Sequence, residues 1–243
     1  MRLHRFIYNF SFSNQKVFIK EGNFVHQIKN VLRLKKGNCL ILVNPKLNVE
    51  ALFEIVKIEL NSVHLRFIKV LDLMKKKNNN EISLFLAVLK KENFELACQK
   101  VTEIGIKRII PLLTERTVKM NIPQKRVLKI IKEASEQAGR LDLPILENVT
   151  EFNDIFSLNF LKSSLNLAFH PTGEDIKNFM GAKINEFQNN NVSIFIGPEG
   201  GFTEKEIETF KENNFYIISL GKNVLRAETA AIVGSYLMFL FSK

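Results

Sequence analysis

The sequence lacks the long apolar runs that would place it in a membrane and the cysteine pairs that would hold a metal. A membrane-spanning helix needs about 20 consecutive apolar residues, and the apolar stretches at 194–196 and 237–241 are far shorter. The start of the chain has no apolar core of the kind found in signal peptides. Cys39 and Cys98 have no paired spacing, so we expect both to be reduced and buried. These absences predict a cytoplasmic protein with no metal site and no membrane contact.

Two common nucleotide-binding motifs are also absent. Segment 197–203, Gly-Pro-Glu-Gly-Gly-Phe-Thr, has no Lys-Ser/Thr after its glycines, which a P-loop requires. The apolar run 82–89 continues directly into Lys90, without the spaced glycines of a dinucleotide-binding fold. P-loop and Rossmann-type sites are therefore excluded.

Positive charge, in contrast, is in excess and unevenly distributed. The formal net charge is +10. Residues 1–72 contain 12 Lys and Arg against 5 Asp and Glu, whereas residues 73–243 contain 23 against 20. A compact basic module suits a polyanion, and nucleic acid is the expected partner. The alternative is a lysine-rich surface that reflects a general composition bias.

The first 72 residues predict a small β-barrel. Short strand-like runs alternate with Gly, Asn and Pro turns, and a short helix near 24–31 interrupts them. Closure into a barrel would remove exposed strand edges. The expected strands are 5–8, 16–19, 39–43, 51–58 and 62–68. The polar segment 74–81 predicts a linker or exposed hairpin, which separates a domain at 1–72 from a domain at 73–243.

Strands and helices alternate in the second domain. Its strands are nearly continuous apolar runs, which is typical of a sheet covered on both faces. The expected strands are 82–89, 108–113, 165–169, 192–196 and 215–220, and the expected helices are 92–103, 124–140, 204–213 and 229–241. This rhythm predicts an α/β domain with a mostly parallel sheet.

Two loops at the ends of expected strands carry the polar chemistry. In the first loop, Thr203 and Glu206 have the spacing of a capping box for the next helix. The second loop places Arg226 and Glu228 just before an apolar helix, where they, or Thr229, could cap the helix or contact a ligand. Ligands bind at the carboxyl ends of strands in α/β sheets, so the pair of loops predicts a small-molecule pocket.

The same two loops resemble a known family. Phe195-Ile-Gly-Pro-Glu-Gly-Gly-Phe and Leu220-Gly-Lys-Asn-Val-Leu-Arg-Ala-Glu-Thr-Ala look like the signature of SPOUT (trefoil-knot) methyltransferases. More narrowly, they are similar to the bacterial 16S rRNA uracil-N3 methyltransferases, the ribosomal small-subunit methyltransferase E family. His26-Gln-Ile-Lys-Asn-Val-Leu-Arg-Leu and the segment 115–144 resemble the family's N-terminal and central segments. The resemblance therefore spans the chain.

The resemblance implies a fold, a cofactor and an assembly. The first domain would be a PUA-like, RNA-binding barrel, and the second a knotted α/β domain. S-adenosylmethionine would lie among the knot loops, and the protein would be a homodimer. The cofactor-binding residues implied by similarity are His170, Pro171, Gly197, Glu199, Gly200, Gly201, Ser219, Leu220, Gly221, Leu225 and Thr229.

The implied reaction requires a group that stabilises negative charge and a group that accepts a proton. Uracil N3 becomes a good nucleophile only after it loses its proton, and a guanidinium would stabilise the negative charge that results. Arg226 is the first candidate for this role and Arg140 the second. Glu199 or Glu228 could accept the proton, although either could instead be a helix cap. The target base must also be unpaired, because N3 takes part in Watson–Crick pairing.

Several basic residues are candidates for RNA contact, with a plain surface or structural role as the alternative. They are Arg5, His26, Arg33, Arg116, Lys125 and Arg126. Two other functions stay open at this point. One is a methyltransferase of the same fold that acts on another base or on a ribose hydroxyl. The other is a non-catalytic RNA-binding factor of ribosome assembly.

Overall fold

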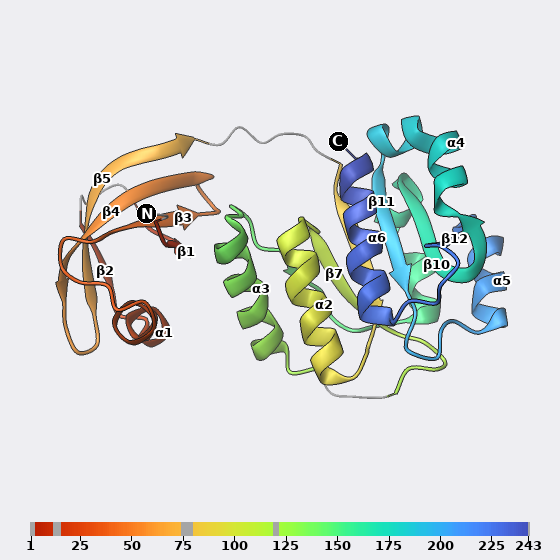
Figure 1. Cartoon of the computed structure of the whole chain (residues 1–243), viewed down its shortest axis with the longest axis horizontal. Coiled ribbons are helices and arrows are strands. Elements are labelled where there is room, and N and C mark those ends of the chain that lie inside the picture. Colours follow the sequence, from red (N-terminus) through yellow and green to blue (C-terminus); the bar gives the residue numbers. More distant parts are fainter. Residues whose placement is uncertain (1–2, 12–15, 74–79, 119–121, 243) are drawn as a thin grey trace. The chain divides into compact units, whose positions relative to one another are not determined.

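The computed structural model describes residues 3–11, 16–73, 80–118 and 122–242. The chain divides into two compact units (Figure 1). Met1–Lys77 and Ser135–Asp142 form the first unit, and Asn78–Ala134 and Leu143–Lys243 form the second. Most of the expected linker, 74–79, lies outside the described residues.

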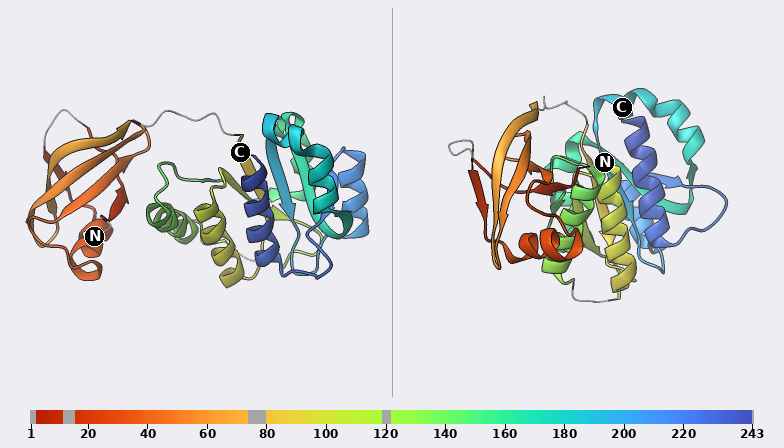
Figure 2. Two further views of the ribbon diagram at one scale, coloured as in Figure 1. Left: turned by 45° about the horizontal axis from the view of Figure 1, so that its top comes forward. Right: turned by 60° about the vertical axis from the view of Figure 1, so that its left-hand side comes forward.

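A five-stranded sheet builds the first unit (Figure 2). Its order is β1-β3-β4-β5-β2, with β1 parallel to β3 and the other neighbours antiparallel. The strands are β1 (Arg5–Ile7), β2 (Lys16–Ile19), β3 (Cys39–Asn44), β4 (Val49–Ile58) and β5 (Val63–Leu73). The expected strands are therefore present, and β2 stands at one end of the order.

Alternating side chains give this sheet one buried face. In β2, Val17 and Ile19 point into the core while Lys16 and Phe18 are exposed. Helix α1 (Gly22–His26) continues into a π-helical turn, Gln27–Val31, and contributes further core residues. The expectation that Cys39 is buried is wrong, because this residue begins β3 and is only partly covered.

The second unit contains a seven-stranded sheet in which every described pairing is parallel. Its order is β12-β10-β11-β6-β7-β8, and β9 also pairs with β7. The strands are β6 (Ile82–Ala87), β7 (Arg108–Leu113), β8 (Ile145–Leu146), β9 (Thr150–Glu151), β10 (Ser164–Asp175), β11 (Asn191–Ile196) and β12 (Tyr216–Ser219). The prediction of an α/β fold with a mostly parallel sheet is confirmed.

Helices cover both faces of this sheet. One core joins a sheet face to α2 (Lys91–Ile104), α3 (Gln124–Ala138), α4 (Ile176–Asn189) and α6 (Ala227–Phe241). A second core joins the opposite face to α5 (Glu204–Glu212) and to the 3-10 helices Phe152–Ser157 and Asn159–Ser163. Six phenylalanines in the second core pack ring against ring, including Phe85 and Phe195 at 4.2 Å between centroids. Cys98 is buried in the first core, as expected.

The structure adds elements that the sequence pattern did not predict. Helix α4 begins at an Asp175 cap, which accepts a hydrogen bond from the backbone N–H of Lys177. Strand β10 continues beyond the expected end at Phe169 after an irregular stretch. Gly173 makes this continuation possible, since a Cβ there would lie 2.5 Å from the backbone nitrogen of Ile218. The polar sequence of this stretch gives no strand signal. It is a strand here because it pairs with β12.

Candidate active site

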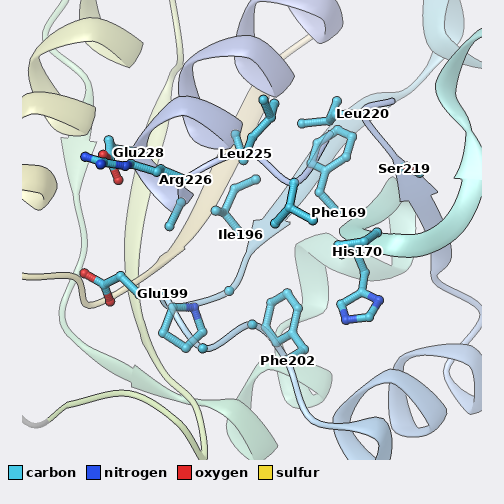
Figure 3. Close-up of a pocket in the computed structure, with 18 of the residues that line it drawn as sticks. Phe169, His170, Ile196, Glu199, Phe202, Ser219, Leu220, Leu225, Arg226 and Glu228 are labelled. Carbon is cyan, nitrogen blue, oxygen red and sulfur yellow. The ribbon is translucent and has the colours of Figure 1, made fainter. Parts of the chain in front are cut away.

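A cavity of about 630 Å³ lies where β11 and β12 end and where β10 becomes irregular after Phe169 (Figure 3). Three stretches of chain line most of it, around 169–171, 196–202 and 219–230. The start of α2 adds Lys90 and Asn93. The pocket expected between the two loops is therefore present, for the reason that applies to α/β sheets in general.

Local hydrogen bonds hold the first loop. Thr203 and Glu206 form the expected capping box at the start of α5. The buried carboxylate of Glu206 also accepts the backbone N–H of Glu115 at 2.9 Å. Arg116 donates to the carbonyl of Gly200 at 2.7 Å. Gly201 has a φ of +69°, which explains why glycine is required there. The loop is therefore fixed by α5 and by the chain beyond β7.

The second loop supplies an apolar wall. The Ser219 hydroxyl donates to the carbonyl of Gly221 at 3.1 Å and accepts its N–H, which shapes the turn. Figure 3 shows Leu220 and Leu225 facing the cavity beside Phe169 and Ile196. This wall offers apolar surface to a planar or aliphatic ligand group.

His170 lines the cavity, and its surroundings favour the uncharged form of its imidazole. Its Nδ1 accepts the backbone N–H of Thr172 at 3.3 Å and lies 2.8 Å from the Thr172 hydroxyl. Burial, and then the positive charge of Arg116, lower the pKa of His170 below its usual 6.5. The lowered pKa favours the uncharged imidazole at neutral pH, and a backbone N–H donated to Nδ1 favours the tautomer that carries its proton on Nε2.

Three charged side chains gather at one side of the cavity in Figure 3, away from His170. Glu199 is exposed, and its Oε1 accepts the backbone N–H of Lys90 at 3.2 Å, at the start of α2. Arg226 is exposed, and its side chain has no hydrogen bond or ion pair among the described residues. Glu228 is only 7% exposed, yet its Oε2 has no hydrogen-bond partner within the described part of the chain. A buried, unpaired carboxylate oxygen is costly, which points to a role toward a ligand.

The structure brings most of the predicted site residues together. Those that line the cavity are His170, Pro171, Gly197, Glu199, Gly200, Gly201, Ser219, Leu220, Gly221, Leu225, Arg226 and Glu228. Thr229 and Arg140 are not among the lining residues. Arg140 belongs to the segment grouped with the first unit, where its guanidinium lies 3.2 Å from Asp142.

Thr229, one of the three residues that could have capped the last helix, does not cap it. Helix α6 begins two residues earlier, at Ala227, with Arg226 in the N-cap position and no side-chain cap. The helix therefore includes Ala227 and Glu228, both of which are buried.

The residues predicted to contact RNA fall into two groups. His26, Arg33 and Lys125 are exposed. The other three have structural partners: Arg5 is paired with Glu50, Arg116 with the Gly200 carbonyl, and Arg126 with the buried Glu95 at 2.6 Å. These three cations are thus already partly neutralised or held in place.

Several cavity residues were missed by sequence reasoning. Lys90 and Asn93 follow β6, and a signal for them existed, because the carboxyl ends of parallel strands share one edge of the sheet. Phe169, Ile196 and Phe202 also line the cavity. Their apolar character makes them indistinguishable from core residues in the sequence.

No group of three or more His, Cys, Asp or Glu side chains that could hold a metal ion occurs within 3–11, 16–73, 80–118 and 122–242. Over the same ranges, no helix combines the length and apolar character needed to cross a membrane.

Comparisons with known proteins agree with this geometry. The RNA methyltransferase domain family matches residues 76–238. A ribosomal RNA small subunit methyltransferase E from Rickettsia conorii is 34% identical over 221 residues, which cover 90% of this chain and 87% of the relative.

Solved structures are also similar. A methyltransferase from Legionella pneumophila, in complex with its cofactor S-adenosylmethionine, has a TM-score of 0.86 and 29% identity, with 98% of this chain and 97% of that chain covered. A ribosomal RNA small subunit methyltransferase E from Neisseria gonorrhoeae, bound to S-adenosylmethionine, has a TM-score of 0.83 at 21% identity over 98% and 97% of the two chains. The similarity to the Neisseria gonorrhoeae structure shows that the two proteins share a fold.

Proposed function

The chain belongs to the family of ribosomal RNA small subunit methyltransferase E, and from that membership we propose that it methylates N3 of one specific uridine in 16S rRNA. S-adenosylmethionine is the methyl donor. The observation that carries the proposal is the cavity at the strand ends, which combines an apolar wall with Arg226 and the buried Glu228. The apolar wall suits the cofactor, and the charged side chains suit a base that gains negative charge as it reacts.

The residues present fit the cofactor. S-adenosylmethionine has a flat adenine, a hydroxylated ribose and a cationic, amino-acid-bearing end. Phe169, Ile196, Leu220 and Leu225 provide apolar surface suited to the adenine. The unpaired oxygen of Glu228 suits a cation or a donor group. We propose that the loops 197–201 and 219–225, with His170 and Pro171, hold the cofactor.

The neutral state of His170 supports this assignment. The cofactor carries a sulfonium cation when bound and supplies an activated methyl group. An uncharged imidazole in the same cavity avoids repulsion of that cation, and the pKa of His170 is lowered in the required direction. Its Nε2 proton remains available as a hydrogen-bond donor.

Arg226 is placed to stabilise the reacting form of the base. Its guanidinium stands at the rim of the cavity and has no partner among the described residues, so it can turn toward a ligand. Negative charge develops on the uracil oxygens as N3 loses its proton, and a guanidinium stabilises that charge. Arg140 remains a second proposal for the same role, although its side chain is close to Asp142.

The two carboxylates have different surroundings, which separates their roles. Glu199 already accepts a backbone N–H at the start of α2, as a helix cap does. Glu228 has a free oxygen and little exposure to water. We therefore propose Glu228 as the acceptor of the N3 proton and Glu199 as a residue that positions α2 against the first loop.

Finer features of the fold are proposed on the same basis. We propose that the first unit is a PUA-like RNA-binding barrel and that the second is knotted near the cavity. The return of β10 to β12 beyond Phe169, at a position that only glycine fits, supports a tightly wound chain there. We also propose a homodimer. The exposed apolar residues Leu96 on α2 and Tyr236 and Leu240 on α6 support an interface on these helices.

Two measurements test the function. Calorimetry should detect S-adenosylmethionine binding to the purified protein, and absence of binding at high micromolar concentration would favour a non-catalytic assembly factor. Mass spectrometry of rRNA from a strain without the gene should show loss of 3-methyluridine from the small-subunit RNA. Loss of a different modification instead would identify a methyltransferase with another target.

A further inference from the structure

Phe18 is an exposed aromatic residue of the first unit. It is not among the residues that line the cavity. Phe18 is 46% exposed, the highest exposure among the described phenylalanines, the rest of which are buried or partly buried. It lies on β2, which is an edge strand, and it points to the outer face of the sheet. A single exposed apolar residue is ordinary, so its surroundings decide what it can do.

The Phe18 ring is held in position by its neighbour on β5. His64 is the cross-strand partner of Phe18, and the two ring centroids are 4.4 Å apart with an interplanar angle of 76°. This edge-on geometry is favourable for aromatic pairs. The contact limits rotation of the Phe18 ring.

His64 is itself anchored at the β4–β5 turn. Its Nε2 lies 3.4 Å from Oε2 of Glu59. Hydrogen bonds from Lys57 and then from Ser62 lower the pKa of Glu59 to about 2, so this carboxylate is charged at every physiological pH. A charged carboxylate therefore lies beside the imidazole of His64, and the edge-on contact with Phe18 sets the orientation of the two rings.

Two lysines flank Phe18 in the sequence, each two residues away. The Lys20 Nζ lies 5.1 Å from the centroid of Phe18, over its face. Lys16 is exposed on the same outward face of β2. Neither lysine forms an ion pair with any residue that the structure describes. Both can reach a phosphate, and the flexible Lys20 can leave the ring when another flat group takes its place.

We propose that Phe18, with Lys16 and Lys20, forms a stacking platform for an unpaired nucleotide of the RNA substrate. A positioned aromatic ring flanked by lysines is the arrangement that binds single-stranded RNA, with the base on the ring and phosphates on the cations. The inference rests on the proposed rRNA substrate and adds a second contact point for it, outside the cavity. Duplex RNA has no free base to stack and would meet only the lysines.

The absence of tryptophan from the chain allows a direct test. Phe18→Trp introduces a single fluorophore at the platform. Titration with a single-stranded oligouridylate should quench its emission to saturation, because a base stacks on the indole. Leu47→Trp is the matched control, since Leu47 is 48% exposed and lies on the same unit, in the turn between β3 and β4. Quenching of both reporters to the same degree, or of neither, would overturn the proposal.

Affinity measurements complete the test. Phe18→Ala should weaken binding of the single-stranded probe about tenfold or more, while Phe18→Tyr retains it and duplex RNA binding changes little. Equal losses for single-stranded and duplex probes would mean that the residue supports the fold or the charge rather than stacking. Calorimetry with S-adenosylmethionine on Phe18→Ala should match the unaltered protein. Loss of cofactor binding in the unaltered protein would contradict the proposed function, not the platform.

Discussion

Arg226 is exposed, lines the cavity, and has no side-chain partner among the residues that the structure describes. Arg226→Ala should lower turnover by about 10²-fold or more, because a charge-stabilising donor acts mainly in the transition state. Affinity for S-adenosylmethionine should stay within a few-fold. Single-turnover methylation and calorimetry measure the two effects. Equal losses in both would assign Arg226 to cofactor binding.

Glu228, the proposed acceptor of the N3 proton, is expected to reduce stability because it is buried with an unpartnered oxygen among the described residues. Glu228→Gln should reduce turnover by about 10²-fold or more, since the amide cannot accept the proton. Its melting temperature should be unchanged or higher, because the buried, unpaired charge is removed. Glu204→Gln, at an exposed position in the first turn of α5, is the control. A lower melting temperature with full activity would make Glu228 a structural residue.

The lowered pKa of His170 predicts how the free energy of unfolding changes with pH. Its folded-state pKa lies below the usual 6.5 of the unfolded chain. Between these two values the unfolded chain binds more protons, so the free energy of unfolding decreases as the pH falls through that window. Melting curves of the protein and of His170→Gln from pH 7.5 to 5 should therefore diverge, with the variant less sensitive to acid. Parallel curves would contradict the lowered pKa.

At the scale of elements, α6 and β10 meet at a glycine. A Cβ on Gly234 would lie 2.8 Å from Cε2 of Phe169, which lines the cavity. Gly234→Ala should push this ring and weaken cofactor binding, although alanine is the better helix former.

Gly181→Ala on α4 is the matched control. A Cβ there meets nothing within 4 Å, so this variant should gain about 0.5–1 kcal/mol of stability from helix propensity alone. Denaturant unfolding and calorimetry separate the effects. Tight cofactor binding by Gly234→Ala would show that the contact between α6 and β10 does not shape the cavity.

The elements also show where sequence patterns are reliable. The apolar runs at β6, β7 and β11 and the capping box of α5 were predicted because each depends on residues close in the chain. Helix α4 and the continuation of β10 were missed. The latter pairs with β12, some forty residues further along the chain, and no local pattern encodes that partner.

For the whole molecule, charge and cofactor chemistry are separated along the chain. The first 72 residues carry a net +7, whereas every residue that lines the cavity lies beyond residue 78. A fragment of residues 73–243 should therefore bind S-adenosylmethionine and lose affinity for rRNA, since phosphate contacts dominate RNA affinity. Filter binding at fixed salt and calorimetry measure the two affinities.

The experiment on the 73–243 fragment needs a control that the fragment is folded. In the full chain, the backbone N–H of Ile7 donates to Glu136 at 2.8 Å, so removal of the first unit also removes contacts of Ser135–Asp142. Circular dichroism should confirm a native melting transition before the affinities are compared. Unchanged rRNA binding by the folded fragment would refute the division of roles.

The sequence by itself determined the α/β rhythm, the parallel sheet, the two loops and the family. These follow from periodicity, glycine positions and motifs, which act over a few residues. Only the tertiary structure decided that Glu199 accepts the N–H of Lys90 at the start of α2, while Glu228 is buried with an oxygen that has no partner among the described residues. It also decided that Lys90 and Asn93 reach the cavity and that Phe18 pairs with His64. The burial of a side chain and its hydrogen-bond partners depend on segments far apart in the chain, so no local sequence pattern predicts them.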